Sequence, residues 1–225
     1  AGRARANYGF FLGAGHDNLE ELDRLDPRAT PGIKVFMGAS TGSNPVDDPQ
    51  LLERIFATAT VPVVTHCEDT PTIRANEAAI RERLGEALEP HHHPAIRTGE
   101  ACWRSSSFAV DLARRLGTNL HVLHLTTARE MALFAPGPIE GKRITAEACI
   151  HHLMFSDADY GARGSRIKCN PAIKSAEDRA ALLAALREDR IDLLATDHAP
   201  HAVADKDRPY LEAAAGLPLV QDFLP

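Results

Sequence analysis

The chain has 225 residues, of which 44% are hydrophobic and 25% are charged, and its formal net charge is −6. This length and apolar content suit one large globular domain over residues 1–225 as well as two small ones, and no apolar run approaches the roughly 20 residues of a membrane span. Acidic and basic residues are mixed without long blocks of either sign. This pattern disfavours nucleic acid and anionic membranes as partners. Because the N-terminal stretch also lacks the long apolar region of a signal peptide, we expect a cytoplasmic protein.

Short apolar runs and helix-like segments alternate along the chain. Runs of apolar or β-branched residues bounded by turn residues predict strands over Tyr8–Leu12, Ile33–Met37, Pro62–His66, Leu120–Leu125, Ile144–Ala148 and Ile191–Thr196. Apolar residues at helical spacing, in several segments that begin at Asp or Thr as N-cap, predict helices over Asp17–Leu25, Asp48–Ala59, Thr70–Leu84, Thr98–Leu116, Thr127–Phe134 and Ala176–Asp189. The alternation indicates a parallel sheet, either doubly wound or closed into a (β/α)₈ barrel.

Cysteines and one histidine tract have simple structural interpretations. The four cysteines are far apart and form no C-x-x-C pair, which disfavours both a disulfide framework and a thiolate zinc site and predicts buried free thiols at Cys67, Cys102, Cys149 and Cys169. The tract HHHPAIR at His91–Arg97 lies between prolines, so we expect it to form an exposed loop.

Polar side chains stand at the ends of several predicted strands. His66 and His124 end two of them, Asp197 follows a third, and Lys34 lies at the start of a fourth. Taken singly, each has an ordinary interpretation as a hydrogen-bonded histidine, a helix cap or a surface lysine. Parallel strands, however, gather their carboxyl ends on one face. Two imidazoles and a carboxylate there predict a Zn²⁺ site with a coordination position open to water.

Other polar residues near these strand ends have supporting interpretations. His121 is three residues before His124, so the pleat should direct it to the other side, where it packs or supports the site. One of His151 and His152 is expected to line the same mouth. Asn170 can donate and accept hydrogen bonds and precedes a proline, which suits a substrate better than a metal. No role is predicted for His198.

Five stretches together resemble the dihydroorotases, cyclic amidohydrolases of the metal-dependent amidohydrolase superfamily. They are GIKVFMGAS, VTHCED, HVLHLTTA, KCNPAIKS and ATDHAPH followed by RPYLEAAAGLP. They occur in the family's order and cover essentially the whole chain. KVFM and VTHC are shared with hydantoinases and allantoinases, whereas DHAPH followed by AGLP, with NP upstream, favours the dihydroorotase branch and its allantoinase neighbours.

The resemblance implies a (β/α)₈ barrel that holds one or two Zn²⁺ ions. Lys34 resembles a lysine that CO₂ carbamylates into an anionic ligand bridging two metals. His66 and His124 resemble the ligands of the second metal. Asp197 resembles the aspartate that binds the first metal and moves the proton, and is therefore the expected catalytic residue.

The chain also departs from the family pattern. The family's H-x-H metal pair, usually followed by a substrate-binding arginine, is not found before Lys34, where His16 is the one histidine. The chain ends at QDFLP soon after its last predicted strand. We therefore expect an incomplete barrel with about strands three to eight, without the first two strands and the C-terminal tail.

The function implied by the resemblance is zinc-dependent hydrolysis of a cyclic amide. Its main form interconverts dihydroorotate and N-carbamoyl-L-aspartate in pyrimidine biosynthesis, with Asn170 and His201 holding this small-molecule substrate. One alternative is an allantoinase or a dihydropyrimidinase-like hydrolase. Another is an inactive dihydroorotase-like scaffold subunit or gene fragment. Partners implied besides the substrate are a second copy of the chain or a transcarbamoylase.

Overall fold

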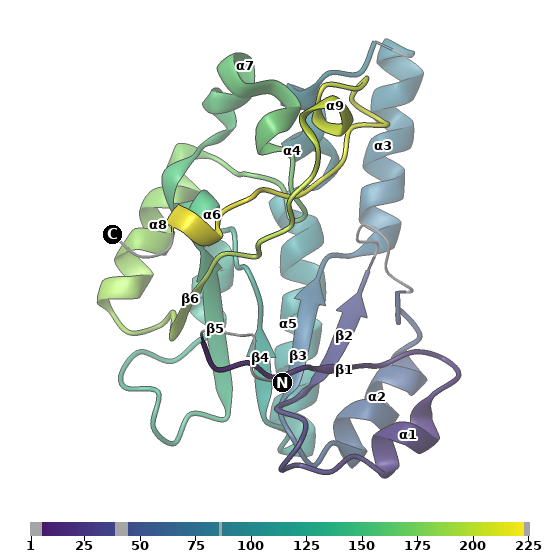
Figure 1. Cartoon of the computed structure of the whole chain (residues 1–225), viewed down its shortest axis with the longest axis vertical. Coiled ribbons are helices and arrows are strands. Elements are labelled where there is room, and N and C mark those ends of the chain that lie inside the picture. Colours follow the sequence, from purple (N-terminus) through teal and green to yellow (C-terminus); the bar gives the residue numbers. More distant parts are fainter. Residues whose placement is uncertain (1–5, 39–44, 86, 223–225) are drawn as a thin grey trace.

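A computed structural model describes residues 6–38, 45–85 and 87–222 (Figure 1). Within those ranges, six parallel strands form one sheet in the order β1-β2-β3-β4-β5-β6. The strands are β1 Leu12–Gly13, β2 Ile33–Met37, β3 Val63–Cys67, β4 Leu120–Val122, β5 Ile144–Cys149 and β6 Leu193–Ala195. Spatial order follows chain order without reversal, as in the wall of a barrel and unlike the sheet of a doubly wound fold. The barrel-type alternative is therefore the observed one.

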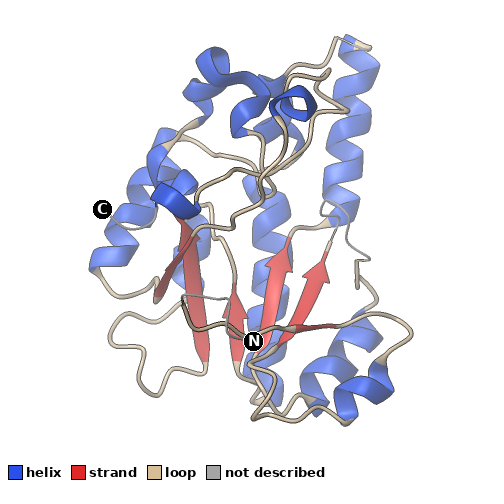
Figure 2. Cartoon of the chain, viewed as in Figure 1, coloured by secondary structure: helices blue, strands red, loops and turns tan. Residues whose placement is uncertain are grey.

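Helices occupy most connections between the strands (Figure 2). The α-helices are α1 Leu19–Asp23, α2 Pro49–Thr58, α3 Thr70–Leu84, α4 His93–Ile96, α5 Gly99–Leu116, α6 Ile150–Met154, α7 Tyr160–Arg163, α8 Ala176–Arg187 and α9 Val203–Lys206. Short 3₁₀ helices span Pro90–His92, Arg129–Leu133, Asp157–Asp159, Gly164–Ile167 and Val220–Asp222. Predicted N-caps are confirmed at Asp48 and Thr98, where a side-chain oxygen accepts from a main-chain N–H, whereas α3 is capped by Asp69 and not by the predicted Thr70.

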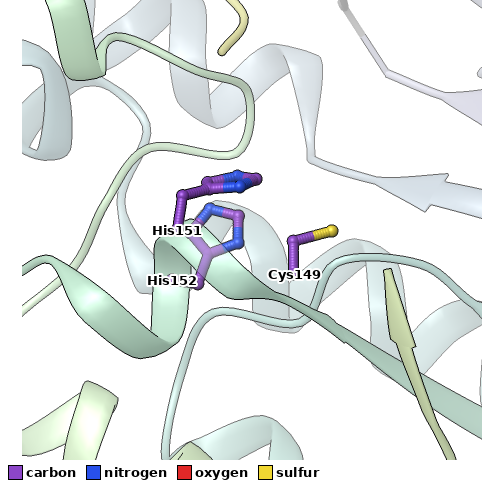
Figure 3. A group of neighbouring side chains, drawn as sticks. All are labelled: Cys149, His151 and His152. Atoms are coloured by element: carbon purple, nitrogen blue, oxygen red, sulfur yellow. The ribbon is translucent and has the colours of Figure 1, made fainter. Parts of the chain in front are cut away.

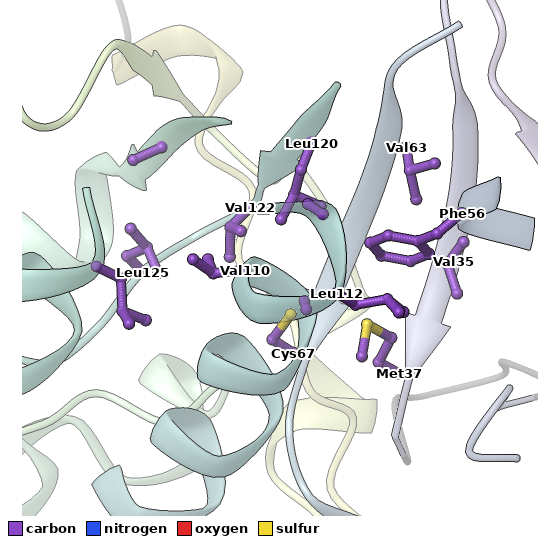
Figure 4. Packing of buried hydrophobic residues seen from close by; sticks show 14 of the residues in the cluster. Val35, Met37, Phe56, Val63, Cys67, Val110, Leu112, Leu120, Val122 and Leu125 are labelled. Atoms are coloured by element: carbon purple, nitrogen blue, oxygen red, sulfur yellow. The ribbon is translucent and has the colours of Figure 1, made fainter. Parts of the chain in front are cut away.

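The main hydrophobic core lies between the sheet and its helices (Figure 4). On β2, Ile33, Val35 and Met37 belong to this core, and Lys34 and Phe36 alternate with them. Period-two alternation places those two side chains on the opposite face, toward the barrel interior. The helix-facing residues therefore hold the sheet together, and the other face is left for polar groups.

Several predicted elements are shorter in the structure. The first strand begins only at Leu12, and Tyr8, Phe10 and Phe11 lie exposed before it. This strand pairs with β2 alone, so one of its edges has no neighbour among the described residues. β4 ends at Val122 because the backbone turns near His124, whose φ is 37°. The predicted helix over Thr127–Phe134 is a 3₁₀ helix.

The expectation of an exposed loop at His91–Arg97 is wrong. This tract forms a 3₁₀ turn and α4, each with a proline at its first turn. His93 is buried, where its Nε2 donates to the carbonyl of Cys169 at 2.8 Å and its Nδ1 accepts from the hydroxyl of Tyr210 at 2.7 Å. Two hydrogen bonds to distant segments draw the tract inward.

The prediction of buried free thiols is confirmed at all four cysteines. None of the helices in the described part of the chain combines the length and apolar character needed to cross a membrane. The last two residues of the GIKVFMGAS motif lie outside the described residues.

Candidate metal and substrate site

Strand register brings three of the predicted metal residues together. Lys34 on β2 pairs with Val64 on β3, two residues before His66. Val64 pairs in turn with His121 on β4, three residues before His124. Because barrel strands are tilted against the axis, side chains at later positions on successive strands reach a common height. Electrostatic interactions with His66 and Lys34 both lower the pKa of His124, as expected of neighbouring groups.

His66 and His124 face one another in the interior. Nδ1 of His66 lies 3.0 Å from Nε2 of His124, and the residues are 1% and 5% exposed. Two nitrogens on a tetrahedral zinc with bonds of 2.0–2.1 Å lie roughly 3.4 Å apart, so this spacing fits a shared ion. Burial lowers the pKa of His124 well below its usual value, which keeps its imidazole in the neutral, metal-binding form. The donor pair therefore fits a metal.

Lys34 and Asp197, the other two predicted metal residues, interact electrostatically with one another. Burial lowers the pKa of Lys34 to about 8, and the opposing charge of Asp197 is the largest influence that raises it. Desolvation raises the pKa of Asp197, whereas Lys34 and His66 lower it. These mutual influences indicate that the four predicted ligands lie in one electrostatic neighbourhood. Asp197 has a φ of 44°, which turns the chain as it leaves β6.

A buried carboxylate beside His66 was not assigned from the sequence. Glu68 is fully buried, and its Oε2 lies 3.1 Å from Nε2 of His66 and against Nη1 of Arg97. Burial raises the pKa of Glu68, but Arg97 and His66 outweigh it and lower the pKa to about 2. An ionised carboxylate on the second ring nitrogen orients a metal-binding histidine. Its position two residues after His66, in VTHCED, was the available signal.

A second missed carboxylate lies on β5. Glu147 has one oxygen 3.4 Å from Nε2 of His121, and its other oxygen accepts from the main-chain N–H of His124 at 3.4 Å. The expectation that His121 points to the other side of the sheet is wrong, because His121 pairs in register with Val64 on the interior face. The turn at His124 breaks the alternation and brings both histidines to this face. A charged residue inside the apolar run ITAEAC was the signal.

The predicted substrate residues line one pocket of about 280 Å³. Its lining includes Asn170, His201 and Asp197, together with His151, which confirms that one residue of the HH pair reaches this mouth. Nε2 of His201 lies 3.0 Å from the carbonyl of Ala215. His198 accepts from the main-chain N–H of Val220 at Nδ1, 3.0 Å away, which gives it a structural contact.

A neighbouring pocket of about 420 Å³ shares Asn170 with the first. Three cationic side chains line it, but each already has partners. Arg81 contacts Glu77 at 2.9 Å, Arg97 contacts Glu68, and the ammonium of Lys168 donates to two main-chain carbonyls at 2.6 Å. These cations therefore hold the pocket walls together.

Curated relatives of this chain are dihydroorotases. The dihydroorotase of Staphylococcus epidermidis RP62A is 32% identical over 197 residues, which cover 88% of this chain and 45% of the relative. That of Carboxydothermus hydrogenoformans is 35% identical over 164 residues, which cover 72% of this chain and 37% of the relative. The chain is a homologue of the dihydroorotases. It spans less than half the length of these curated relatives, and no family model matches it.

Solved structures show that this dihydroorotase homologue shares the fold of hydantoinases and of a dihydroorotase. A D-hydantoinase superposes with a TM-score of 0.83 at 21% identity, covering 96% of this chain and 49% of that chain. L-hydantoinase (dihydropyrimidinase) from Arthrobacter aurescens gives 0.80 at 24% identity, covering 93% and 47%. Dihydroorotase from Saccharomyces cerevisiae in complex with 5-fluoroorotic acid gives 0.65 at 19%, covering 90% and 54%. The expected barrel type is confirmed, with the described strands forming part of its wall.

Proposed function

We propose that this chain forms part of the active site of a zinc-dependent cyclic amide hydrolase, with dihydroorotate and N-carbamoyl-L-aspartate as its substrate and product. Homology to dihydroorotases supports the reaction class. The observation that carries the metal requirement is the buried pair formed by Nδ1 of His66 and Nε2 of His124 at 3.0 Å. Imidazole nitrogens at this spacing suit Zn²⁺.

His66 and His124 would hold one ion, and Asp197 would hold the other. Lys34, once carbamylated at its amine, would bridge the two ions. Bound zinc supplies polarisation of the ring carbonyl and acidification of a water molecule. Glu68 fixes the ring of His66 from its second nitrogen, and Glu147 fixes the turn at His124.

Asp197 carries the proton in this proposal. Its carboxylate accepts a proton from the attacking water, the water oxygen bonds to the ring carbonyl carbon, and the carbon–nitrogen bond breaks as Asp197 returns the proton to the leaving nitrogen. Asn170 and His201 line the same pocket and would bind the polar edge of the ring. The chain's own residues thus supply proton transfer and substrate positioning.

A second candidate is a hydantoinase or dihydropyrimidinase activity, which the high TM-scores to those enzymes support. Their identities of 21% and 24% are below the 32% and 35% shared with the dihydroorotases, so dihydroorotase remains the main proposal. Location in the cytoplasm and association with a second copy or with a transcarbamoylase are parts of the same proposal. The remaining alternative to the hydrolase proposal is an inactive scaffold subunit.

The test uses the full-length protein encoded by the gene, supplied with Zn²⁺ and assayed on dihydroorotate, hydantoin, dihydrouracil and allantoin. We expect dihydroorotate to have the highest kcat/KM. A preference for another ring would transfer the assignment to the second candidate. A protein that binds Zn²⁺ but hydrolyses none of the four rings would support the scaffold role.

Metal content gives a separate check on the proposed ligands. The His66→Ala change should lower both bound zinc per chain and turnover, because it removes a ligand. The His91→Ala change alters an exposed histidine and should leave zinc content unchanged. Equal zinc content in wild type and His66→Ala would reassign His66 to a structural role.

A further inference from the structure

A second group of potential metal ligands lies where β5 passes into α6. Cys149 is the last residue of the strand, and His151 and His152 lie in the first turn of the helix. One potential ligand atom from each residue lies within 4.8 Å of the others, and Figure 3 shows the three side chains gathered on one side of the turn. Their exposed fractions are 0%, 1% and 3%. The group is therefore compact and buried.

The two imidazoles keep ring nitrogens without hydrogen-bond partners in the described part of the protein. Both nitrogens of His151 and Nδ1 of His152 are in this condition. Buried polar atoms are nearly always paired, so three such atoms in one cluster indicate a partner that the described protein atoms do not provide. Two separate side chains thus point to a bound species.

His152 has the tautomer that metal binding requires. Its Nε2 lies 3.1 Å from the carbonyl oxygen of Pro171. A carbonyl can only accept, so Nε2 carries the hydrogen and Nδ1 carries a lone pair. A histidine that ligates through one nitrogen and donates to a carbonyl through the other is the usual arrangement at metal sites.

We propose that Cys149, His151 and His152 form a thiolate-containing site for a single borderline-soft cation of the Zn²⁺ class, distinct from the site at Lys34, His66, His124 and Asp197. One thiolate and two imidazoles suit such a cation, and three protein ligands leave a fourth position for water or another ligand. His151 also lines the 280 Å³ pocket, so the cation would lie at the pocket wall.

Binding has a definite proton balance. The thiol of Cys149 loses its proton to solvent as the sulfur–metal bond forms, and the imidazoles bind as neutral ligands. Ligand atoms on a tetrahedral zinc lie roughly 3.3–3.8 Å apart, so the separations of up to 4.8 Å shorten on binding. Side-chain rotation of Cys149 and His151 can supply this change.

Cobalt(II) titration of the metal-free full-length protein tests the proposal. A thiolate ligand gives Co²⁺ a strong sulfur-to-metal charge-transfer absorption, which the nitrogen and oxygen ligands of the other site cannot produce. We expect this absorption to saturate at one Co²⁺ per chain and to disappear when Zn²⁺ is added. The His66→Ala variant should keep it, which separates this proposal from the proposed hydrolase site.

Variants locate the sulfur and the nitrogens. Cys149→Ser and His152→Gln should lose the absorption, while Cys102→Ser, a change of another buried free thiol, should keep it. Cys169→Ser should also keep the absorption, and it is the stricter control because Sγ of Cys169 lies 3.8 Å from Nε2 of His152. Absence of the absorption in wild type, or its persistence in Cys149→Ser, would overturn the proposal. Circular dichroism confirms that each variant is folded, and the wild-type result stands even if a variant is not.

Discussion

Asp197 and His201 lie four residues apart on the segment that follows β6, but their surroundings differ. Asp197 interacts electrostatically with Lys34 and His66, whereas His201 contacts the carbonyl of Ala215. Both line the same pocket. In the proposed function, the first residue would transfer the proton and the second would contact the polar edge of the substrate.

These surroundings predict different kinetic effects in the full-length enzyme. Asp197→Asn should nearly abolish kcat and leave KM within a modest factor, because an amide fills the same space but cannot accept the proton. His201→Asn should mainly raise KM, at a cost of about 1–3 kcal/mol for one lost polar contact. Steady-state kinetics measure both. Equal losses of kcat with unchanged KM in the two variants would contradict this division of roles.

His93 should make the stability of the protein depend on pH. Burial, followed by the charge of Arg97, lowers its pKa from 6.5 to about 3, while the hydrogen bond to Cys169 opposes the shift. The unfolded chain therefore binds a proton below pH 6.5 that the folded chain does not bind. The contribution of His93 to the free energy of unfolding is therefore fully present above pH 6.5. It decreases by about 1.4 kcal/mol per pH unit as the pH falls from 6.5 toward 3.

The difference between wild type and His93→Gln isolates this contribution, since other buried histidines are common to both proteins. Between pH 7.5 and 5.0, wild type should lose about 2 kcal/mol more of its free energy of unfolding than the variant, because only about 1.5 units of this interval lie below pH 6.5. Urea unfolding at the two pH values measures this. The exposed His91→Gln change is the matched control. A His93→Gln protein with the wild-type pH slope would refute the assignment.

At the scale of elements, the segment after β6 folds back so that residues near its start contact the main chain near Leu217. The main-chain N–H of Ala199 donates to the carbonyl of Leu217 at 3.0 Å, and His198 forms a parallel bridge with Leu217. Gly216 has a φ of 139°, and a Cβ there would lie 2.6 Å from the carbonyl oxygen of Ala199 and 3.0 Å from Nε2 of His201. Glycine is needed here for both conformation and space.

The Gly216→Ala change should therefore destabilise the protein by about 1–3 kcal/mol and displace His201, which raises KM. The matched control is Gly161→Ala in α7, where a Cβ would meet nothing within 4 Å. The control should leave KM unchanged and stability equal or slightly higher. Thermal unfolding and steady-state kinetics of both variants give the comparison, and similar results for the two would remove the steric argument.

At the scale of the whole molecule, the sheet has two end strands. β1 and β6 each pair with one neighbour within the described residues. Leu193 and Leu194 on β6 are both 45% exposed, and Phe10 before β1 is 77% exposed. Apolar residues on an unpaired strand edge favour association with other chains.

Self-association of the 225-residue chain should therefore depend on β6. Leu194→Lys should lower the average particle mass seen by light scattering at a given concentration, because a charge on an exposed edge opposes pairing. Met154→Lys is the control, since Met154 is 60% exposed but lies on α6. An equal effect of both changes would show that general surface charge, not the strand edge, controls association.

Some of this architecture follows from the sequence alone. β2 has the predicted bounds, and β3 and β5 lie within one residue of theirs at each end, because buried parallel strands are short apolar runs with clear limits. The gathering of His66, His124 and Asp197 was foreseeable, because parallel strands have their carboxyl ends at the same side of the sheet. Lys34 lies near the start of β2, and it joins them only through the strand register. The local sequence thus indicates both where the strands begin and end and which side chains follow them.

Tertiary structure decided the contacts between residues far apart in the chain. The pairing of Glu68 with Arg97, the burial of His93 against Tyr210 and the closeness of Glu147 to His121 join segments whose separation in sequence carries no signal. The grouping of Cys149 with His151 and His152 is local, but only the turn from β5 into α6 and the carbonyl of Pro171 give it a ligand geometry. Periodicity specifies which face a side chain occupies, while register, turns and burial specify what it meets there.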